Sequence, residues 1–350
     1  MSGVQIAWAN ALSESTLVFF TTLAPSAAFA YLALLILLFR SGIDTVIHEQ
    51  IHHLLWAPLV LCMIGLIASA THLGNPSNAL YVLMRVGSSP LSNEVFAAGA
   101  FLGMAAVFWL ASFSIQKYYL VERIAMVCII ASGICFIAAI SCAYHVETIV
   151  TWSMLLMPTT IACSSAMGGP LLALCCLQAT DPFPGKVPFA KGLAVVSFVA
   201  TVAWLSMQTA IGLALPGIAN ELFTASELVP MFWPALVLSS VLCLAGSVSP
   251  FVVARRLGWG VFKAYPAGHK SVKQKSIEQN AEQKRAIQES ARQKITAQEP
   301  AEQKVAGQES VGRELSARYW LIGASVSMLI GIFIMRFMFY MMHMTVGVAV

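Results

Sequence analysis

Long runs of apolar residues, separated by short polar segments, dominate the chain. A membrane span needs about 20 apolar residues to cross about 30 Å of hydrocarbon. Backbone polar groups in a bilayer must be satisfied within their own segment, so such runs predict helices rather than strands. We therefore expect an all-α polytopic membrane protein with eight transmembrane helices. The eight runs are about 17–39, 54–70, 95–115, 124–144, 153–177, 192–215, 231–254 and 319–344.

The composition supports this interpretation and excludes a soluble globular enzyme. Hydrophobic residues make up 58% of the 350 residues, and Asp, Glu, Lys and Arg only 10%, against about 25% charged residues in soluble proteins. Residues 255–318 hold 20 of the 36 charged residues. The chain therefore divides into the first seven spans (1–254), a polar segment (255–318), and the last span with its tail (319–350).

The basic residues predict an orientation in the membrane. If the N-terminus lies outside, the inner loops contain 18 Lys and Arg residues and the outer loops contain only Arg85. Positive charges accumulate on the cytoplasmic side of membrane proteins, so we expect both termini outside. No Lys or Arg precedes the first span, and we expect that span to be an uncleaved part of the mature fold.

The polar segment contains a ten-residue repeat over about 277–316, in which Gln, Glu and Lys recur at equivalent positions. Ten residues fit neither a 7- nor an 11-residue helical repeat, so no continuous apolar stripe forms. We predict a solvated cytoplasmic loop, partly helical or disordered. A protein-docking role is the alternative.

Small residues within the spans predict close contacts between helices. Four glycines fall in such positions, namely Gly99, Gly103, Gly168 and Gly169.

The histidines and cysteines predict neither haem nor an iron–sulfur cluster in this chain. All eight cysteines lie in apolar runs and no Cys-x-x-Cys occurs, so the ligand spacing of clusters and zinc ribbons is missing. Bis-histidine haem needs two facing histidines at depth. His72, His145 and His343 lie at outer span ends and the other four lie in inner loops.

Two polar residues flank the outer loop between the second and third spans. His72 emerges from the second span ahead of the turn that begins at Gly74. A helix end does not require an imidazole, and histidine is suited to exchanging protons near neutral pH. Glu94 follows Ser92 where the third span begins, and we expect Ser92 to be the N-cap of that helix.

Arg336 is the only Asp, Glu, Lys or Arg residue within a predicted span. An intramembrane arginine is costly unless it is paired or faces a polar cavity. His343 lies two turns later, on the same face of a helix. The alternative is an arginine that extends to the outer interface. Glu14 precedes the first span, where a carboxylate also suits a helix N-terminus.

Three more histidines, His48, His52 and His53, lie together in the first inner loop. Their spacing is compatible with metal binding, but no cysteine or clear set of carboxylates joins them. We interpret them as residues of a solvated loop.

Three blocks of sequence resemble the anchor-subunit family of anaerobic dimethyl sulfoxide reductases. The first contains His72 and Glu94, the second contains Thr151 and Trp152, and the third begins at Arg336. Eight spans with both termini outside also match that family. The blocks are 67–95, 146–173 and 336–350.

The resemblance implies a subunit that oxidises quinol, either menaquinol or ubiquinol, at the outer face of the bacterial cytoplasmic membrane. Electrons would pass to an iron–sulfur subunit and then to a molybdopterin catalytic subunit on the periplasmic side, for anaerobic respiration. No haem or cluster in this chain and no nucleic-acid partner is implied. The candidate quinol-binding residues are Glu14, His72, Gly74, Glu94, Arg336 and His343.

The expected roles differ among these residues. His72 would accept protons from quinol, and Glu94 would orient the imidazole or pass the proton outward. Gly74 would allow the backbone to approach the head group. Arg336 would hold a quinone oxygen or balance a carboxylate.

One position departs from the family. A glutamate often stands four residues before the arginine of the last span, and Ile332 occupies that position here. The partner of Arg336 is therefore missing, or comes from another helix through Glu14 or Glu94. Two other classes remain open from the sequence, a secondary transporter and a b-type cytochrome.

Overall fold

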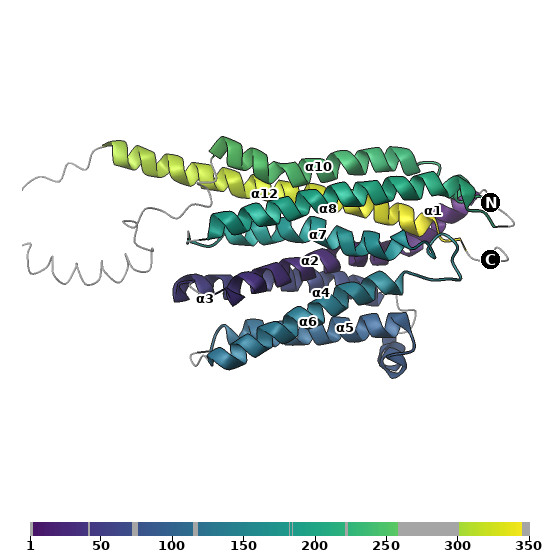
Figure 1. The fold of residues 1–350 in the computed structure, drawn as a ribbon, viewed down its shortest axis with the longest axis horizontal. Helices are drawn as coiled ribbons and strands as arrows, with labels where there is room; N and C mark the ends of the chain where they lie inside the picture. Colours follow the sequence, from purple (N-terminus) through teal and green to yellow (C-terminus); the bar gives the residue numbers. More distant parts are fainter. Residues whose placement is uncertain are drawn as a thin grey trace, which may run out of the picture.

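The computed structural model describes residues 3–40, 43–71, 76–114, 118–181, 183, 185–220, 223–257 and 301–344, without the side chains of 76–80, 256–257 and 301–315. These residues form an elongated bundle of helices (Figure 1). The described part of the chain contains no β-strand, and an isolated bridge joins Ala219 to Thr224.

In the described part of the chain, eight helical segments are long and apolar enough to cross a membrane. They confirm the eight predicted spans and the all-α polytopic fold. The segments are α2 (Ser15–Phe39), α3 with α4 (Thr45–Leu54 and Trp56–Thr71), α5 (Pro90–Ala111), α6 (Tyr119–Ala143), α7 (Leu156–Gln178), α8 (Lys186–Ala214), α10 (Phe232–Leu257) and α12 (Ala301–Met341). The shorter helices are α1 (Gly3–Ser13), η1 (Pro76–Arg85), η2 (Leu215–Gly217) and α9 (Ala225–Leu228).

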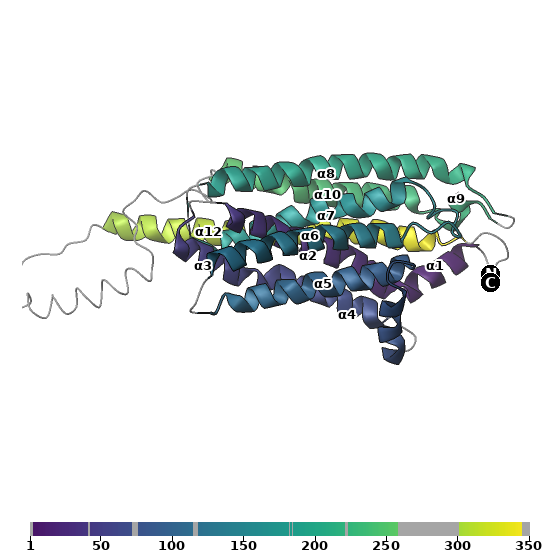
Figure 2. The same cartoon turned by 60° about the horizontal axis from the view of Figure 1, so that its bottom comes forward.

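Helices α2 and α7 form the centre of the bundle. Both bury most of their residues, whereas α4 and α5 bury fewer than a third in their most apolar stretch. Helix α2 packs on α4 and α7, α5 packs on α6, and α10 packs on α12. Figure 2 shows η1 projecting sideways from the bundle near the end of α4. The exposed apolar surfaces of the outer helices suit contact with lipid.

Two of the four predicted glycine contacts are confirmed and two are wrong. A Cβ atom at Gly169 would lie 2.5 Å from Cβ of Phe29, and one at Gly168 would lie 2.7 Å from Oγ of Ser26. These glycines therefore let α7 approach α2 closely. Gly99 and Gly103 of α5 have nothing within 4 Å of such an atom, because their side of the helix is open.

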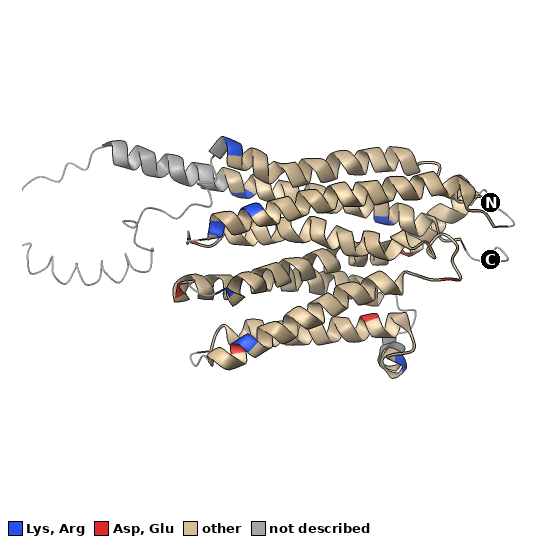
Figure 3. Cartoon of the chain, viewed as in Figure 1, with Lys and Arg blue, Asp and Glu red and all other residues tan. Residues whose placement is uncertain are grey.

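The described Lys and Arg residues gather mainly at one end of the bundle, which we call the basic end (Figure 3). Both ends of the described chain lie at the opposite end (Figure 1), which we call the termini end. This separation is what the sequence predicted. The side of the membrane that each end faces stays a prediction.

One predicted boundary is wrong at the basic end. The segment that holds His48 and His52 forms α3, which is continuous in direction with α4, rather than a solvated loop. The Asp44 carboxylate caps this helix by accepting from the Val46 amide at 3.3 Å, as a helix N-terminus requires. The last membrane span, Ser316–Met341, agrees with the predicted start near 319, and helix α12 extends back from it to Ala301.

Candidate functional site

Arg336 of α12 is buried at the termini end, with only 2% of its surface exposed. Its Nη2 donates to Oγ of Ser164 at 2.8 Å and to the carbonyl oxygen of Thr160 at 3.2 Å. Both partners lie on α7. Among the described residues, neutral oxygens rather than a carboxylate therefore hold the guanidinium. Ile332 stands four residues before Arg336, where the resemblance led us to expect a glutamate. Arg336 therefore has no ion-pair partner in the described chain.

The loop between α6 and α7 fixes the end of α12 beside Arg336. The Trp152 ring stacks on Phe339 at a centroid distance of 4.5 Å, and its Nε1 donates to the Phe339 carbonyl at 3.1 Å. The Thr151 hydroxyl donates to the carbonyl of Met342. The Val150 amide donates to the Met344 carbonyl at 3.0 Å. These contacts position the residues at and just beyond the end of α12.

Two tyrosines cover the arginine. The rings of Tyr144 and Tyr340 meet edge to face with centroids 5.9 Å apart. Burial raises the pKa of Tyr144 well above its usual range, and the neighbouring Tyr340 and the charge of Glu94 raise it further. Tyr144 follows the end of α6. Because its pKa is raised, its side chain is a neutral phenol at physiological pH. It is suited to donating a hydrogen bond rather than to carrying charge.

Glu94 lies inside α5 and only 3% of its surface is exposed. The helix begins at Pro90 with Ser89 as the N-cap residue, so the predicted capping role of Ser92 is wrong. Ser92 is instead buried in the first turn. One carboxylate oxygen of Glu94, Oε2, has no hydrogen-bond partner among the described residues. Buried polar atoms normally have a partner, so this oxygen is available to a ligand or to a moving proton.

Glu14 and His343 complete the group at the termini end. Glu14 stands in the turn between α1 and α2, at the N-cap position of α2. Burial lowers the pKa of His343 below its ordinary value, and the nearby charge of Glu14 opposes that shift. His343 is therefore a neutral base at pH 7. Its ring also packs against Trp152 at a centroid distance of 5.1 Å.

Four of the six candidate residues thus lie at one end of the bundle, on three segments of the chain: Glu14, Glu94, Arg336 and His343. His72 and Gly74 lie outside the described residues. The face shared by Arg336 and His343 is not a helical face, because α12 ends at Met341 and His343 lies in the following turn. Stacking on Trp152 positions His343 instead.

Sequence reasoning missed the neutral residues that hold the charged ones. Tyr144 and Ser164 carry no pattern that separates them from other polar residues near the membrane. Thr151 and Trp152 were visible as part of a block that resembles the family. Their role in binding the end of α12 follows only from the fold, because about 190 residues separate the partners.

Comparison with known proteins gives a consistent result. The family model described as DMSO reductase anchor subunit (DmsC) matches residues 9–257. The C subunit of the anaerobic dimethyl sulfoxide reductase of Haemophilus influenzae is 31% identical over 243 residues, which are 68% of this chain and 83% of that protein. The C subunit of the Escherichia coli enzyme is 26% identical over 237 residues, 66% of this chain and 82% of that protein.

A third relative is the anaerobic dimethyl sulfoxide reductase protein YnfH of Escherichia coli, which is 30% identical over 187 residues. The matched region covers 53% of this chain and 64% of YnfH, slightly less than two thirds. The family match includes Glu14 and Glu94 but ends before Arg336 and His343. It extends over most of the chain and over seven of the eight spans. The chain therefore belongs to the family of DMSO reductase anchor subunits and is a multi-pass membrane protein.

Proposed function

We propose that this chain is the quinol-oxidising anchor of a bacterial reductase complex and that quinol reacts at the termini end. Electrons would pass to an iron–sulfur partner subunit and from there to a molybdopterin catalytic subunit. Both partners would lie on the outer face of the cytoplasmic membrane. Membership of the anchor-subunit family supports this role. The choice of terminal acceptor, dimethyl sulfoxide or a related compound, would belong to the catalytic subunit.

The termini end offers the groups that quinol oxidation needs. Quinol loses two electrons and two protons on conversion to quinone, so a base must stand within reach of its hydroxyl groups. Glu94 supplies a buried carboxylate oxygen without a partner among the described residues. His343 supplies a neutral imidazole that is only partly buried. Protons accepted by Glu94 would leave through His343 and Glu14 toward the outer surface.

A buried positive charge suits the other requirement of the reaction. As a hydroxyl proton leaves quinol, negative charge develops on its oxygen, and a fixed cation in a low-dielectric site stabilises that charge strongly. Among the described residues, neutral oxygens of α7 accept hydrogen bonds from Nη2 of Arg336. Its Nε has no hydrogen-bond partner among the described residues.

The observation that carries the proposal is the buried Glu94 with its unpartnered oxygen, at the same end as the buried Arg336. From the sequence we add His72 as a proton acceptor and Gly74 as a point of close backbone approach. Both residues stand between α4 and η1 in the chain. The bound substrate would be menaquinol or ubiquinol, with no haem or cluster in this chain.

The test compares two electron donors on the complete complex. We expect Glu94→Gln and His72→Ala to assemble normally and to lose quinol-dependent turnover by about 100-fold or more, the usual contribution of a general base. A soluble dye that donates directly to the partner subunits should still support reduction. The matched control is Glu147→Gln, an exposed carboxylate of the loop between α6 and α7, which should behave as wild type.

Full quinol turnover in Glu94→Gln would remove Glu94 from the mechanism. Loss of both quinol and dye activity would instead indicate a failure to dock the partners. The other two classes give distinct signals in the same preparation. A b-type cytochrome would show haem absorption, and a transporter would move a solute in liposomes that hold this protein alone.

A further inference from the structure

The basic end of the bundle holds a second cluster of ionisable side chains, on two helices. His48 and His52 lie on α3, four residues apart. This spacing places both imidazoles on one face of a helix, as in helical zinc sites with two histidines at i and i+4. Glu122 faces them from the first turn of α6. A carboxylate from another helix thus joins the two histidines of α3.

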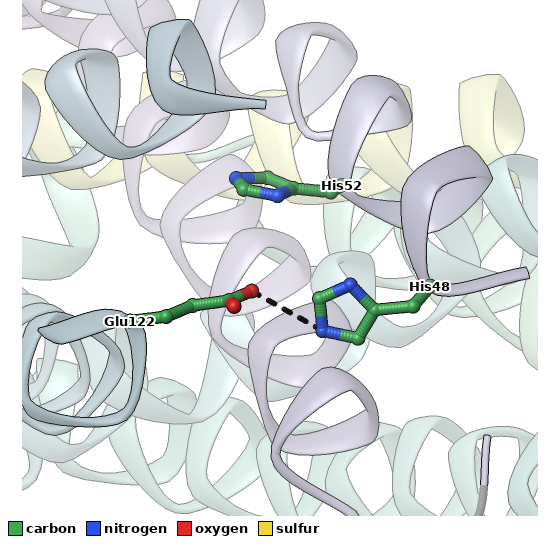
Figure 4. Close-up of side chains that lie close together, drawn as sticks. All are labelled: His48, His52 and Glu122. Atoms are coloured by element: carbon green, nitrogen blue, oxygen red, sulfur yellow. Dashed lines mark ion pairs between the residues drawn. The ribbon is translucent and has the colours of Figure 1, made fainter. Parts of the chain in front are cut away.

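The three side chains converge (Figure 4). Nε2 of His48 lies 3.3 Å from Oε1 of Glu122. One potential ligand atom from each of the three residues lies within 4.8 Å of the other two. Two ligands of one tetrahedral zinc ion, each at about 2.1 Å, stand about 3.4 Å apart. The His48–Glu122 separation already has about this value, and His52 would have to move closer to both partners.

A backbone contact sets the tautomer of His52. Its Nε2 lies 2.8 Å from the carbonyl oxygen of Phe108. A carbonyl only accepts, so Nε2 carries the proton and Nδ1 carries the lone pair. The Phe108 ring, 4.3 Å away between centroids, holds the imidazole in place. A hydrogen bond from the second ring nitrogen to a backbone carbonyl is the arrangement that orients histidine ligands of metals.

The cluster is open to solvent on one side. The side chains of His48 and Glu122 are 22% and 20% exposed. A cavity of about 560 Å³, lined in part by His52, Glu122, Ser114 and Tyr118, adjoins it. An ion could therefore enter, and water could complete its coordination. Arg123, which follows Glu122 in α6, donates to the Phe39 carbonyl and lies over the Phe39 ring, so its side chain is held against α2.

We propose that His48, His52 and Glu122 bind a divalent transition-metal ion at the basic end, with zinc as the best match. Two imidazoles and one carboxylate are a borderline ligand set that suits zinc and neighbouring metals rather than calcium or magnesium. Three protein ligands leave one position of a tetrahedral ion for water. The bound ion would link α3 to α6 at the mouth of the cavity. This site is separate from the proposed quinol site.

The test is a titration of the purified complex with Co²⁺, which reports a tetrahedral site by visible absorption. The complex is isolated with an affinity tag free of histidine and is treated with a chelator. We expect saturable binding of one Co²⁺ per anchor subunit, reversed by Zn²⁺. Acid should weaken binding, because protons compete for the imidazoles.

Three variants assign the site. His48→Ala and Glu122→Gln should each weaken Co²⁺ binding by at least about 10-fold, since even outer-shell changes cost that much. The control is His53→Ala, on the same helix. Its Nδ1 bonds to Oγ of Ser112 at 3.0 Å, and it lies outside the ligand set. It should bind Co²⁺ as wild type does.

Two results would overturn the proposal. The first is a wild-type complex that shows no stoichiometric Co²⁺ binding, which would mean that His48 and Glu122 form an ion pair only. The second is Co²⁺ binding in His48→Ala and Glu122→Gln that is as tight as in the wild type. The wild-type titration tests the proposal by itself, so the proposal can still be refuted if a variant assembles poorly.

Discussion

The two ends of the bundle use ionisable residues in opposite ways. At the termini end, the ionisable side chains of Arg336 and Glu94 lie deep in the structure, and the groups that hold the arginine are neutral. At the basic end, His48 and Glu122 contact each other directly and are about one fifth exposed. The first arrangement leaves charge uncompensated in a region of low dielectric, whereas the second compensates it at a surface.

This difference indicates different chemistry. An uncompensated buried charge is costly and responds strongly to any new charge that develops beside it. Such a site suits a reaction in which protons and electrons leave a bound molecule. A compensated and accessible group of imidazoles and a carboxylate suits a cation that replaces the proton between them. This contrast is why we propose redox chemistry at the termini end and cation binding at the basic end.

The largest effect that we expect comes from removing the buried cation. Arg336→Met should lower quinol-dependent turnover by about 100- to 1000-fold, the usual loss when a fixed electrostatic stabiliser is removed. Assembly should survive, because an apolar side chain in place of a buried charge is often neutral for stability. Turnover and the amount of complex in the membrane are the two measurements.

Two variants accompany this measurement. Arg336→Lys should lose less, since it keeps the charge but not the geometry of the guanidinium. Arg318→Met removes an exposed arginine of the same helix and should have no effect. If Arg336→Met turned over as wild type does, the buried charge would have no role in the reaction, and the contrast between the two ends would fail.

A smaller effect should appear in the pH dependence. Burial lowers the pKa of His343 and the charge of Glu14 raises it. The imidazole can accept a proton from quinol only above this pKa, because below it the ring is already protonated. Quinol-dependent activity should therefore fall as the pH drops through that pKa. Glu14→Gln removes the opposing charge and should move this acid limb to lower pH.

The profile of kcat/KM against pH is the measurement, with Glu147→Gln as the control. An acid limb that stays in place, or that moves to higher pH, would show that the charge of Glu14 does not raise the pKa of His343. The proton route at the termini end would then need another acceptor.

The smallest effect should come from the polar segment. Deleting residues 270–300 should leave assembly and quinol turnover largely intact, because this hydrophilic stretch has no apolar periodicity from which to form a core. The deletion stops before α12 begins at Ala301. A complex that failed to assemble would show that the segment docks a partner, which was the alternative from the sequence.

The spans were predictable because length and apolarity suffice to define them, and the bilayer leaves helices as the solution. The short helices were not. Helix α1 has too few apolar residues to stand out as a span. It becomes stable by packing on α12, where Trp8 meets Phe337 with ring centroids 5.2 Å apart. Helix α3 looked like a polar loop because its three histidines obscured its helical periodicity.

The site was predictable only where a residue is unusual for its place in the chain. Arg336 and Glu94 stood out because charge is rare in this sequence. Ser164 did not, since one serine among many in the spans carries no signal. The pairing of His48 with Glu122 required knowing that α3 and α6 meet at the basic end, which the local pattern of neither helix reveals.

One crossed measurement tests the assignment of the two ends most directly. Glu94→Gln and Glu122→Gln each replace one carboxylate by its neutral isostere, at opposite ends of the bundle. Quinol-dependent turnover and Co²⁺ affinity are measured on both complexes. We predict that Glu94→Gln loses turnover and keeps Co²⁺ binding, whereas Glu122→Gln keeps turnover and loses Co²⁺ binding. Loss of quinol turnover in Glu122→Gln, with Glu94→Gln fully active, would contradict the account and move the redox site to the basic end.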